Sequence, residues 1–356
     1  MIRKFLSTAC AALALSLALA PTVRAAISQA KVERTAPDTL SIEWDDRNPV
    51  NLYQVSGPDG GFKGARRLLA GDAHGRYELA RTGLERRYFV IEDAVDHQRV
   101  KVAERLVPLA KGSNFRDIGG YVGAGGKHVR WGAIYRSAGQ PLLTPEDLAQ
   151  VSTLGVTQLV DLRSSEERVI APTRIAGVPY TAVGYSIADL LTQSDRSTVT
   201  NGTEIYRKFP RLLAPQLRVI FAHLLGAKGV LVYNCSAGQD RTGFITAVIL
   251  TALGVQRSAI IEDYHLSTHY RRPEFEMPPL DAAAHPNEPV VQLFARLQQR
   301  PNWKTPEPLK SADGRPFLDG AFDEIDANWG SVNGYLTKVI GISKQDIARL
   351  RALYLE

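Results

Sequence analysis

The chain has 356 residues, of which 44% are hydrophobic and 22% charged, and its formal net charge is +6. This length suffices for two domains with hydrophobic cores. The 43 basic and 37 acidic residues are spread along the chain without the basic stripe that nucleic-acid binding requires, so we expect no nucleic-acid partner.

Residues 1–25 have the order of features of a secretory signal peptide. Arg3 and Lys4 precede an apolar run over residues 5–20, and a small-residue cleavage site follows at Ala25. The run is short for a membrane span and no second one follows, so we expect an exported, periplasmic or secreted protein without a transmembrane segment. Removing this leader lowers the net charge to about +3, because it holds three basic residues and no acidic ones.

Residues 26–108 have the pattern of short β-strands. Polar and apolar residues alternate over residues 39–44, 52–55, 87–91 and 99–103, and turns rich in glycine and proline separate these runs. Short strands at this spacing predict a small all-β, sandwich-like domain. The segment resembles a fibronectin type III module, which can position the rest of the chain or bind a protein partner.

Residues 109–356 change to an alternation of strands and helices. Apolar runs over residues 156–162 and 229–233 predict buried strands. Thr144 and Ser164 are predicted to cap helices, because residues typical of a first helical turn follow each of them. The alternation predicts an α/β domain, a central sheet flanked by helices.

Charged residues lie close to the predicted strand ends. Asp161 and Arg163 stand at the carboxyl end of a strand, where open α/β sheets bind ligands, but a mutual ion pair explains them equally well. Arg136 is a further candidate for a pocket. For Arg136, Arg116 and Asp117, the favoured interpretation is that they stabilise the fold instead of contacting a ligand.

Cys235 is the only cysteine after the leader, since Cys10 lies within it. It stands between a predicted strand and a helix predicted over residues 242–253. A strand, a turn containing Gly238 and a helix N-terminus point unpaired backbone amides at one place, and this geometry binds anions and favours an ionised thiol. Arg241 adds a guanidinium that can hold two phosphate oxygens. We therefore predict a reactive thiol instead of an inert core residue.

The arrangement Cys235-x5-Arg241-Thr242 is the signature of cysteine-dependent phosphatases. Together with the segments at residues 114–121 and 160–164, it resembles the bacterial tyrosine phosphatases that also act on phosphoserine, phosphothreonine and phosphoinositides, a family with a secreted mycobacterial member. The resemblance covers roughly the last two thirds of the chain. It implies the fold of the cysteine phosphatases and a metal-independent phosphatase without a cofactor.

The family implies that Cys235 forms a phosphocysteine and that Arg241 and the loop amides bind the phosphate. The phosphate-binding positions implied are Ser236, Ala237, Gly238, Gln239, Asp240, Arg241 and Thr242. The Thr242 hydroxyl is expected to hydrogen-bond the sulfur. Asp240 matches the general acid of the family, although a carboxylate favoured by the helix dipole is the alternative, and Asp189 is the second candidate for the acid.

Two residues depart from the family pattern. Asn234 stands where the family has histidine, which keeps an inactive phosphate-binding scaffold as an alternative. Gln239 replaces a lysine associated with inositol phosphates, and losing this cation favours phosphotyrosine over a phosphoinositide or inositol polyphosphate substrate. A cysteine enzyme of another class, such as a sulfur transferase, would not require Arg241.

Overall fold

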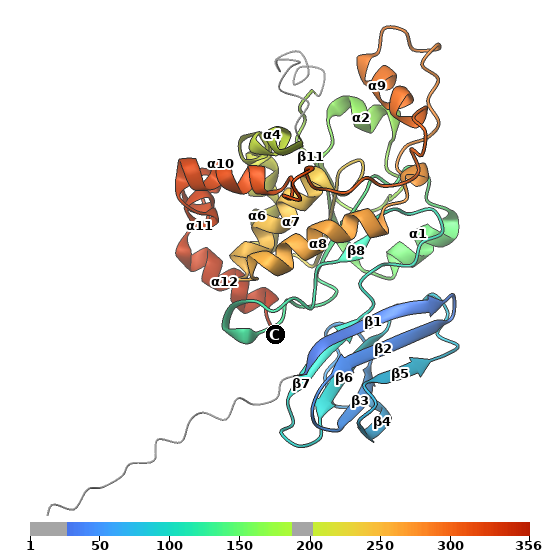
Figure 1. Ribbon diagram of the computed structural model, residues 1–356, viewed down its shortest axis with the longest axis vertical. Coiled ribbons are helices and arrows are strands. Elements are labelled where there is room, and N and C mark those ends of the chain that lie inside the picture. Colours follow the sequence, from blue (N-terminus) through green and yellow to red (C-terminus); the bar gives the residue numbers. More distant parts are fainter. Residues whose placement is uncertain (1–26, 187–201) are drawn as a thin grey trace, which may run out of the picture.

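The computed structural model describes residues 27–186 and 202–356 (Figure 1). The predicted leader and Asp189 lie outside these residues. The N-terminal part is a module of antiparallel strands in two sheets, with the orders β1-β2-β5 and β4-β3-β6-β7. Its strands are β1 (Ser28–Ala36), β2 (Thr39–Asp45), β3 (Val50–Val55), β4 (Arg66–Asp72), β5 (Arg76–Leu79), β6 (Tyr88–Asp93) and β7 (Arg99–Ala103).

The module has its own hydrophobic core, as the alternating pattern predicts. Leu40 and Ile42 of β2 and Phe89 and Ile91 of β6 are fully buried, and Trp44 packs with them. The predicted all-β domain is confirmed. Strands β1, β4 and β5 were not predicted. Most residues of β1 and β4 are exposed and carry little apolar alternation, and β5 is only four residues long. The fibronectin resemblance, the domain boundary at residue 108 and the protein partner stay predictions.

The second part is built on a five-stranded sheet with the order β11-β10-β12-β9-β8. Strands β9 to β12 run parallel, and β8 joins the edge antiparallel to β9. The strands are β8 (Arg116–Asp117), β9 (Ile134–Ser137), β10 (Val156–Asp161), β11 (Tyr180–Ala182) and β12 (Val230–Asn234). Strand β12 is therefore central, and the residue after it is Cys235. This agrees with the α/β fold predicted from the sequence.

Helices cover both faces of this sheet. Alternate residues of β12 point to opposite sides: Leu231 and Tyr233 belong to the larger core, and Val232 to the smaller core under α1. The helices are α1 (Pro145–Ser152), α2 (Ser165–Ile170), α4 (Gly202–Arg207), α5 (Phe209–Leu212), α6 (Ala214–Leu225), α7 (Asp240–Ala252), α8 (Arg257–Tyr270), α9 (Pro289–Gln298), α10 (Asp319–Trp329), α11 (Val332–Tyr335) and α12 (Lys344–Tyr354), with short turns η1 (Ala124–Gly126), η2 (Pro273–Phe275) and η3 (Leu336–Ile340).

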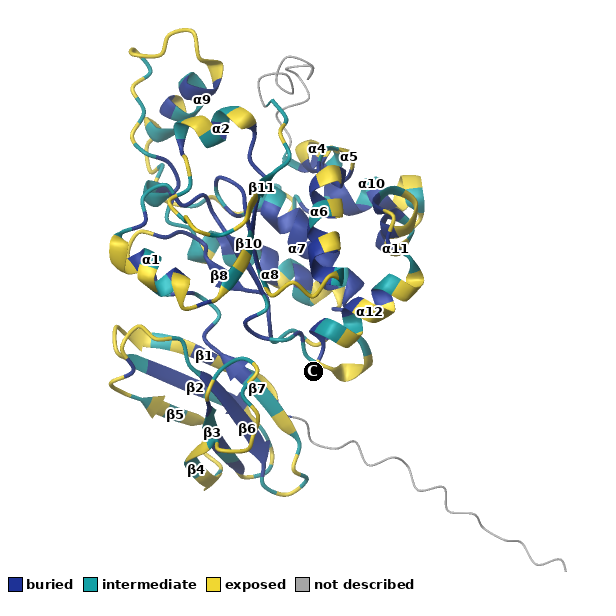
Figure 2. Ribbon diagram, turned by 180° about the vertical axis from the view of Figure 1, so that it is seen from behind, coloured by how far each residue is buried: buried dark blue, intermediate teal, exposed yellow. Residues whose placement is uncertain are grey.

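Helix α7, which follows the cysteine loop, is the most enclosed helix of the larger core, whereas the chain before α9 is exposed (Figure 2). Because most residues of α7 are buried, packing around the helix holds its N-terminus in place beside β12. A helix on the surface would be held less firmly. No helix in the described part of the chain is both long and apolar enough to cross a membrane.

Leu231→Ala tests the assignment of the core beneath the loop. Leu231 is fully buried, so the substitution should lower the free energy of unfolding by about 3 kcal/mol through lost burial and the cavity left behind. Urea unfolding followed by circular dichroism measures the change. Leu84→Ala makes the same deletion at a side chain that is 50% exposed, and should cost less than about 0.5 kcal/mol. Equal costs would contradict the assignment of this core.

Candidate active site

The loop after β12 turns its carbonyl groups away from its own centre. The Ser236 carbonyl accepts a hydrogen bond from the Gly139 amide at 3.0 Å. The Asn114 side-chain amide donates to the carbonyls of Ala237, at 3.1 Å, and Gly238, at 2.8 Å. Because N–H and C=O point in opposite directions across a trans peptide, the amides of the loop face the other way.

These inward amides form an anion-binding nest at the N-terminus of α7. Within residues 27–186 and 202–356, no group accepts a hydrogen bond from the backbone amides of residues 236–239. Cys235 lies beside them, with its residue only 1% exposed. Unpaired amides at a helix N-terminus bind an anion, and the helix dipole adds to that attraction. The structure thus has the geometry predicted for the cysteine loop.

Gly238 is required by the close approach of this loop to β9. Its φ angle is +64°, which favours glycine. A β-carbon at this position would lie 2.5 Å from the Ala138 nitrogen and 2.6 Å from the Ser137 carbonyl oxygen. Any side chain would therefore push the loop away from the strand that supports it.

Arg241 is held by a buried carboxylate that the sequence did not reveal as a site residue. Its two terminal nitrogens each donate to one oxygen of Glu167 at 2.7 Å, and Nη1 also donates to the Tyr185 hydroxyl at 2.6 Å. Burial alone would lower the pKa of Arg241, but Glu167 and Tyr185 raise it well above its usual value. The Nε–H of Arg241 donates to no described group and remains available to a phosphate oxygen.

Glu167 also joins the loop to the start of α2. Its carboxylate accepts from the Ser236 hydroxyl at 2.6 Å and from the Ser164 amide at 2.8 Å. Burial would raise the pKa of Glu167, but Arg241 and these hydrogen bonds lower it to about 2. The Ser164-x-x-Glu167 spacing predicted a capping box, which is present. That local role explained the glutamate fully, so no sequence signal indicated its contact with Arg241.

Asp240 is the first residue of α7, and its carboxylate is oriented by two donors. The Tyr206 hydroxyl donates to Oδ1 at 2.5 Å, and the Gln239 side-chain amide reaches the same oxygen at 3.3 Å. Tyr264 donates to the Tyr206 hydroxyl at 2.7 Å. Burial and the Asp240 charge raise the pKa of Tyr206 well above its usual value, so it remains a donor. Oδ2 receives no hydrogen bond from the described residues and can carry a proton.

A buried group of charges lies behind the loop. Arg136 donates from Nη2 to the Gly238 carbonyl at 2.8 Å and from Nη1 to Asp263 at 2.5 Å. Arg116 pairs with the same carboxylate at 3.3 Å and also donates to the Asn114 side chain. Burial would raise the pKa of Asp263, but the two guanidiniums hold it well below its usual range. Two cations against one anion leave a positive charge behind the nest, which favours bound phosphate.

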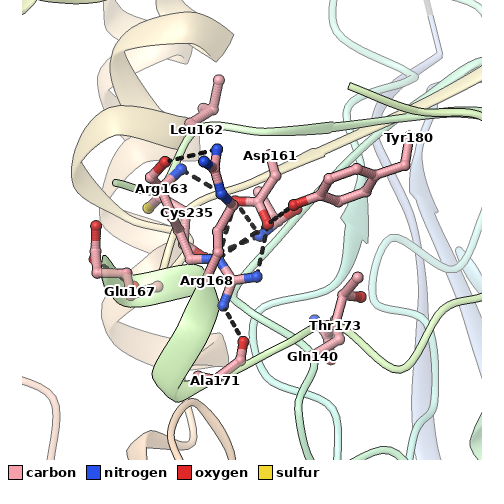
Figure 3. Close-up of polar contacts among 12 residues, drawn as sticks. Gln140, Asp161, Leu162, Arg163, Glu167, Arg168, Ala171, Thr173, Tyr180 and Cys235 are labelled. Carbon is pink, nitrogen blue, oxygen red and sulfur yellow. Dashed lines mark hydrogen bonds and ion pairs between the residues drawn. The ribbon is translucent and has the colours of Figure 1, made fainter. Parts of the chain in front are cut away.

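Asp161, Arg163 and Arg136, the residues predicted as candidates for a pocket, are fully buried. Asp161 and Arg163 pair with each other, with Nη2 and Oδ2 at 2.6 Å, and Tyr180 donates to Asp161 at 2.9 Å (Figure 3). The pairing occurs because an ionised group without a partner cannot remain buried. Asp161 and Arg163 therefore form the mutual ion pair that was the alternative interpretation. Arg136 stabilises the fold through its contacts with Gly238 and Asp263. Asn234 donates to Asp161 at 3.4 Å.

The hydrogen bonds of Thr242 and Gln239 differ in part from those expected from the sequence. The Thr242 hydroxyl is buried and has no hydrogen-bond partner among the described residues, so the predicted bond to the sulfur is not formed. Gln239 accepts a hydrogen bond from Arg271. That guanidinium pairs with Glu276 at 2.7 Å, so the cation beside the loop is neutralised. Arg271 lies about thirty residues after the loop and was not singled out from the sequence.

The sequence of the region that contains this site is similar to known proteins. A family model described as the tyrosine phosphatase family matches residues 107–356. A Cupriavidus necator protein with the name "putative tyrosine-protein phosphatase" is 33% identical over 253 residues, covering 68% of this chain and 86% of that protein. The triple specificity protein phosphatase PtpB of Mycobacterium tuberculosis is 30% identical over 292 residues, covering 68% of this chain and 96% of the relative.

A tyrosine-protein phosphatase of Nostoc commune is 27% identical over 241 residues, covering 62% of this chain and 73% of that protein. The matched family region contains the whole cysteine loop together with Asn114, Arg136 and Glu167, the residues that hold it. The loop geometry and the extent of the match lead to one conclusion: this chain belongs to the tyrosine phosphatase family.

Proposed function

We propose that the protein is an exported phosphatase that hydrolyses phosphomonoesters, with protein phosphotyrosine as the preferred substrate, through a phosphocysteine intermediate. The observation that carries the proposal is the set of outward carbonyls at residues 236–238, which turns unpaired amides toward the place beside Cys235. The signal-peptide composition of residues 1–25 supports export. The phosphatase domain of residues 109–356 would then follow the module of residues 26–108.

In the first step, the Cys235 thiolate attacks phosphorus, and the bond between phosphorus and the tyrosyl oxygen breaks as the sulfur–phosphorus bond forms. The loop amides and Arg241 bind the equatorial oxygens, where charge is greatest in the transition state. Asp240 gives its proton to the leaving oxygen. Tyr206 and Gln239 hold Oδ1, which supports Oδ2 as the atom that carries this proton.

In the second step, a water molecule attacks the phosphorus of the phosphocysteine. The Asp240 carboxylate accepts a proton from that water, the sulfur–phosphorus bond breaks, and inorganic phosphate leaves with the thiolate restored. The sum of the two steps is hydrolysis of one phosphate ester by one water molecule. The residue that served as acid is again protonated, so the cycle closes with no metal and no external proton carrier.

The preference for phosphotyrosine is supported by the charges at the rim of the loop. Gln239 is neutral, and the nearby Arg271 is paired with Glu276, so neither residue offers an uncompensated cation to a second phosphate group. The name of the mycobacterial relative, a triple specificity protein phosphatase, supports a range that also includes phosphoserine and phosphothreonine. Phosphoinositides are the alternative.

Phosphate release by the chain without residues 1–25 tests the proposal directly. A phosphotyrosine peptide should be hydrolysed, and Cys235→Ser should abolish the release, because a hydroxyl is a far weaker nucleophile here than a thiolate. Phosphatidylinositol phosphates, assayed in parallel, should react more slowly. A faster lipid reaction would assign the alternative substrate. No release from either substrate by folded, reduced protein would refute the enzyme and favour the phosphate-binding scaffold.

Glu167→Gln should lower kcat/KM by about a hundredfold, because Arg241 loses the carboxylate that orients it. Glu166→Gln is the matched control, since the neighbouring Glu166 bonds to Ser186 and not to Arg241. Equal kcat/KM in both variants would contradict the assigned role.

The pKa of Glu167 gives a separate expectation for the pH dependence. Because its folded-state pKa, about 2, is below its ordinary value of 4.5, the contribution of Glu167 to stability is complete above pH 4.5 and is lost as the pH falls through about 2. Wild-type pH–rate profiles between about pH 5 and 8 should therefore contain no step from Glu167.

Asp240→Asn distinguishes the two candidates for the acid. Its kcat on phosphotyrosine should fall by about 10²–10⁴, because the tyrosyl oxygen leaves poorly without a proton. The loss should be much smaller with p-nitrophenyl phosphate, whose phenolate leaves more readily. Asp189→Asn should leave both rates within about twofold of wild type. The opposite pattern, a selective loss in Asp189→Asn, would assign the acid to Asp189.

A further inference from the structure

Arg86 is a module residue buried against the phosphatase domain. Its side chain is 3% exposed. It donates to the Asp117 carboxylate at 2.7 Å and to the Tyr135 hydroxyl at 2.6 Å, both in the second domain. Within the module it donates to the Tyr88 hydroxyl at 2.6 Å and to the Glu104 carbonyl at 2.9 Å. One guanidinium therefore joins the two domains through buried hydrogen bonds on both sides.

The two residues that Arg86 contacts in the second domain are directly opposite each other in the sheet. Asp117 of β8 pairs in register with Tyr135 of β9, and Arg116 pairs with Arg136. Successive residues of a strand point to opposite faces, so one pair faces the module and the other faces the cysteine loop. The side chains agree: Arg86 bonds the first pair, and the second pair surrounds the loop.

Asp117 fixes the backbone on both sides of this strand pair. Its carboxylate accepts from the Gly119 amide at 2.8 Å and from the Gly132 amide at 2.6 Å. The module also touches this point, because a β-carbon on Gly132 would lie 2.6 Å from Pro58. Arg86 supplies the cation for a carboxylate that is fully buried. Without it, Asp117 would have no ion-pair partner among the described residues, and β8 would have to move to hydrate the carboxylate.

We infer that Arg86 is a positioning residue for the cysteine loop, and that the N-terminal module is thus a working part of the active site. Arg86 fixes Asp117 and Tyr135 on one face of β8 and β9. The other face then holds Arg116 and Arg136, which bind Asn114 and Gly238 and keep the carbonyls turned outward. The inference rests on the proposed function for its catalytic consequence, but not for its effect on phosphate binding.

Arg86→Met in the chain without residues 1–25 tests this coupling, with Arg34→Met as the matched control. Arg34 is a largely buried arginine of the module that bonds Glu104 at 2.8 Å, Pro37 at 2.9 Å and Gly83 at 2.8 Å, all within the module. Both substitutions remove a guanidinium that stabilises the module. Only the first removes the contact to β8 and β9.

Two assays are run at a temperature at which circular dichroism shows both variants folded. The first gives kcat and KM on p-nitrophenyl phosphate, and the second gives the protection of Cys235 from iodoacetamide by inorganic phosphate. Arg86→Met should lower kcat about tenfold and weaken phosphate protection about tenfold, because the amides no longer converge. Arg34→Met should stay within about twofold of wild type. Equal changes in the two variants, or none in Arg86→Met, would overturn the inference.

Asp117→Asn combined with Arg86→Met keeps the test decisive if the single variant does not fold. The double variant has no uncompensated carboxylate, so it should fold and recover part of the phosphate protection. If phosphate gave the folded double variant no protection of Cys235 from iodoacetamide, the coupling through this ion pair would be contradicted. A wild-type protein that binds phosphate but releases none from esters would refute the proposed function alone, since the protection assay still tests Arg86.

Discussion

The site depends on one constraint, the need to hold several peptide groups of the loop with their amides facing one point. Parallel peptide dipoles repel one another, and their carbonyls require donors on the outer side. Asn114, Arg136 and the Gly139 amide supply those donors. These groups lie in or beside β8 and β9, at the edge of the sheet. The central strand ends directly before Cys235, but the neighbouring strands determine whether the loop that follows can bind an anion.

Charge is distributed around the loop so that each guanidinium is paired before substrate arrives. Arg241 pairs with Glu167 on the substrate side, while Arg116 and Arg136 share Asp263 behind the loop. Burying a cation without a partner would be costly, so these carboxylates allow the cations to be present at all. The pairing also limits movement: a guanidinium fixed by two bonds is oriented before phosphate binds, which reduces the ordering cost at that step.

The sequence was sufficient for features whose parts are adjacent in the chain. The strand, the glycine turn and the helix around Cys235 form one continuous segment, so their spacing predicted the nest. Contacts across long separations were not accessible: Asn114 and Gly238 are 124 residues apart, and Glu167 and Arg241 are 74 apart. Asp161 was a candidate for a pocket, because a strand end is the usual place for ligands, and equally for an ion pair with Arg163. The structure instead uses that position for a buried ion pair, an alternative that the sequence left open.

Asn234 can be understood from the same local charges. Its side chain donates to Asp161, whose carboxylate is already paired with Arg163 and bonded by Tyr180. A protonated histidine at this position would add a cation to a pair that is already balanced, whereas a neutral amide completes its hydrogen bonding. The field on Cys235 then comes from the loop amides, the N-terminus of α7 and the buried guanidiniums behind them. Asn234 is therefore accounted for by its neighbours, and it gives no reason to favour an inactive scaffold.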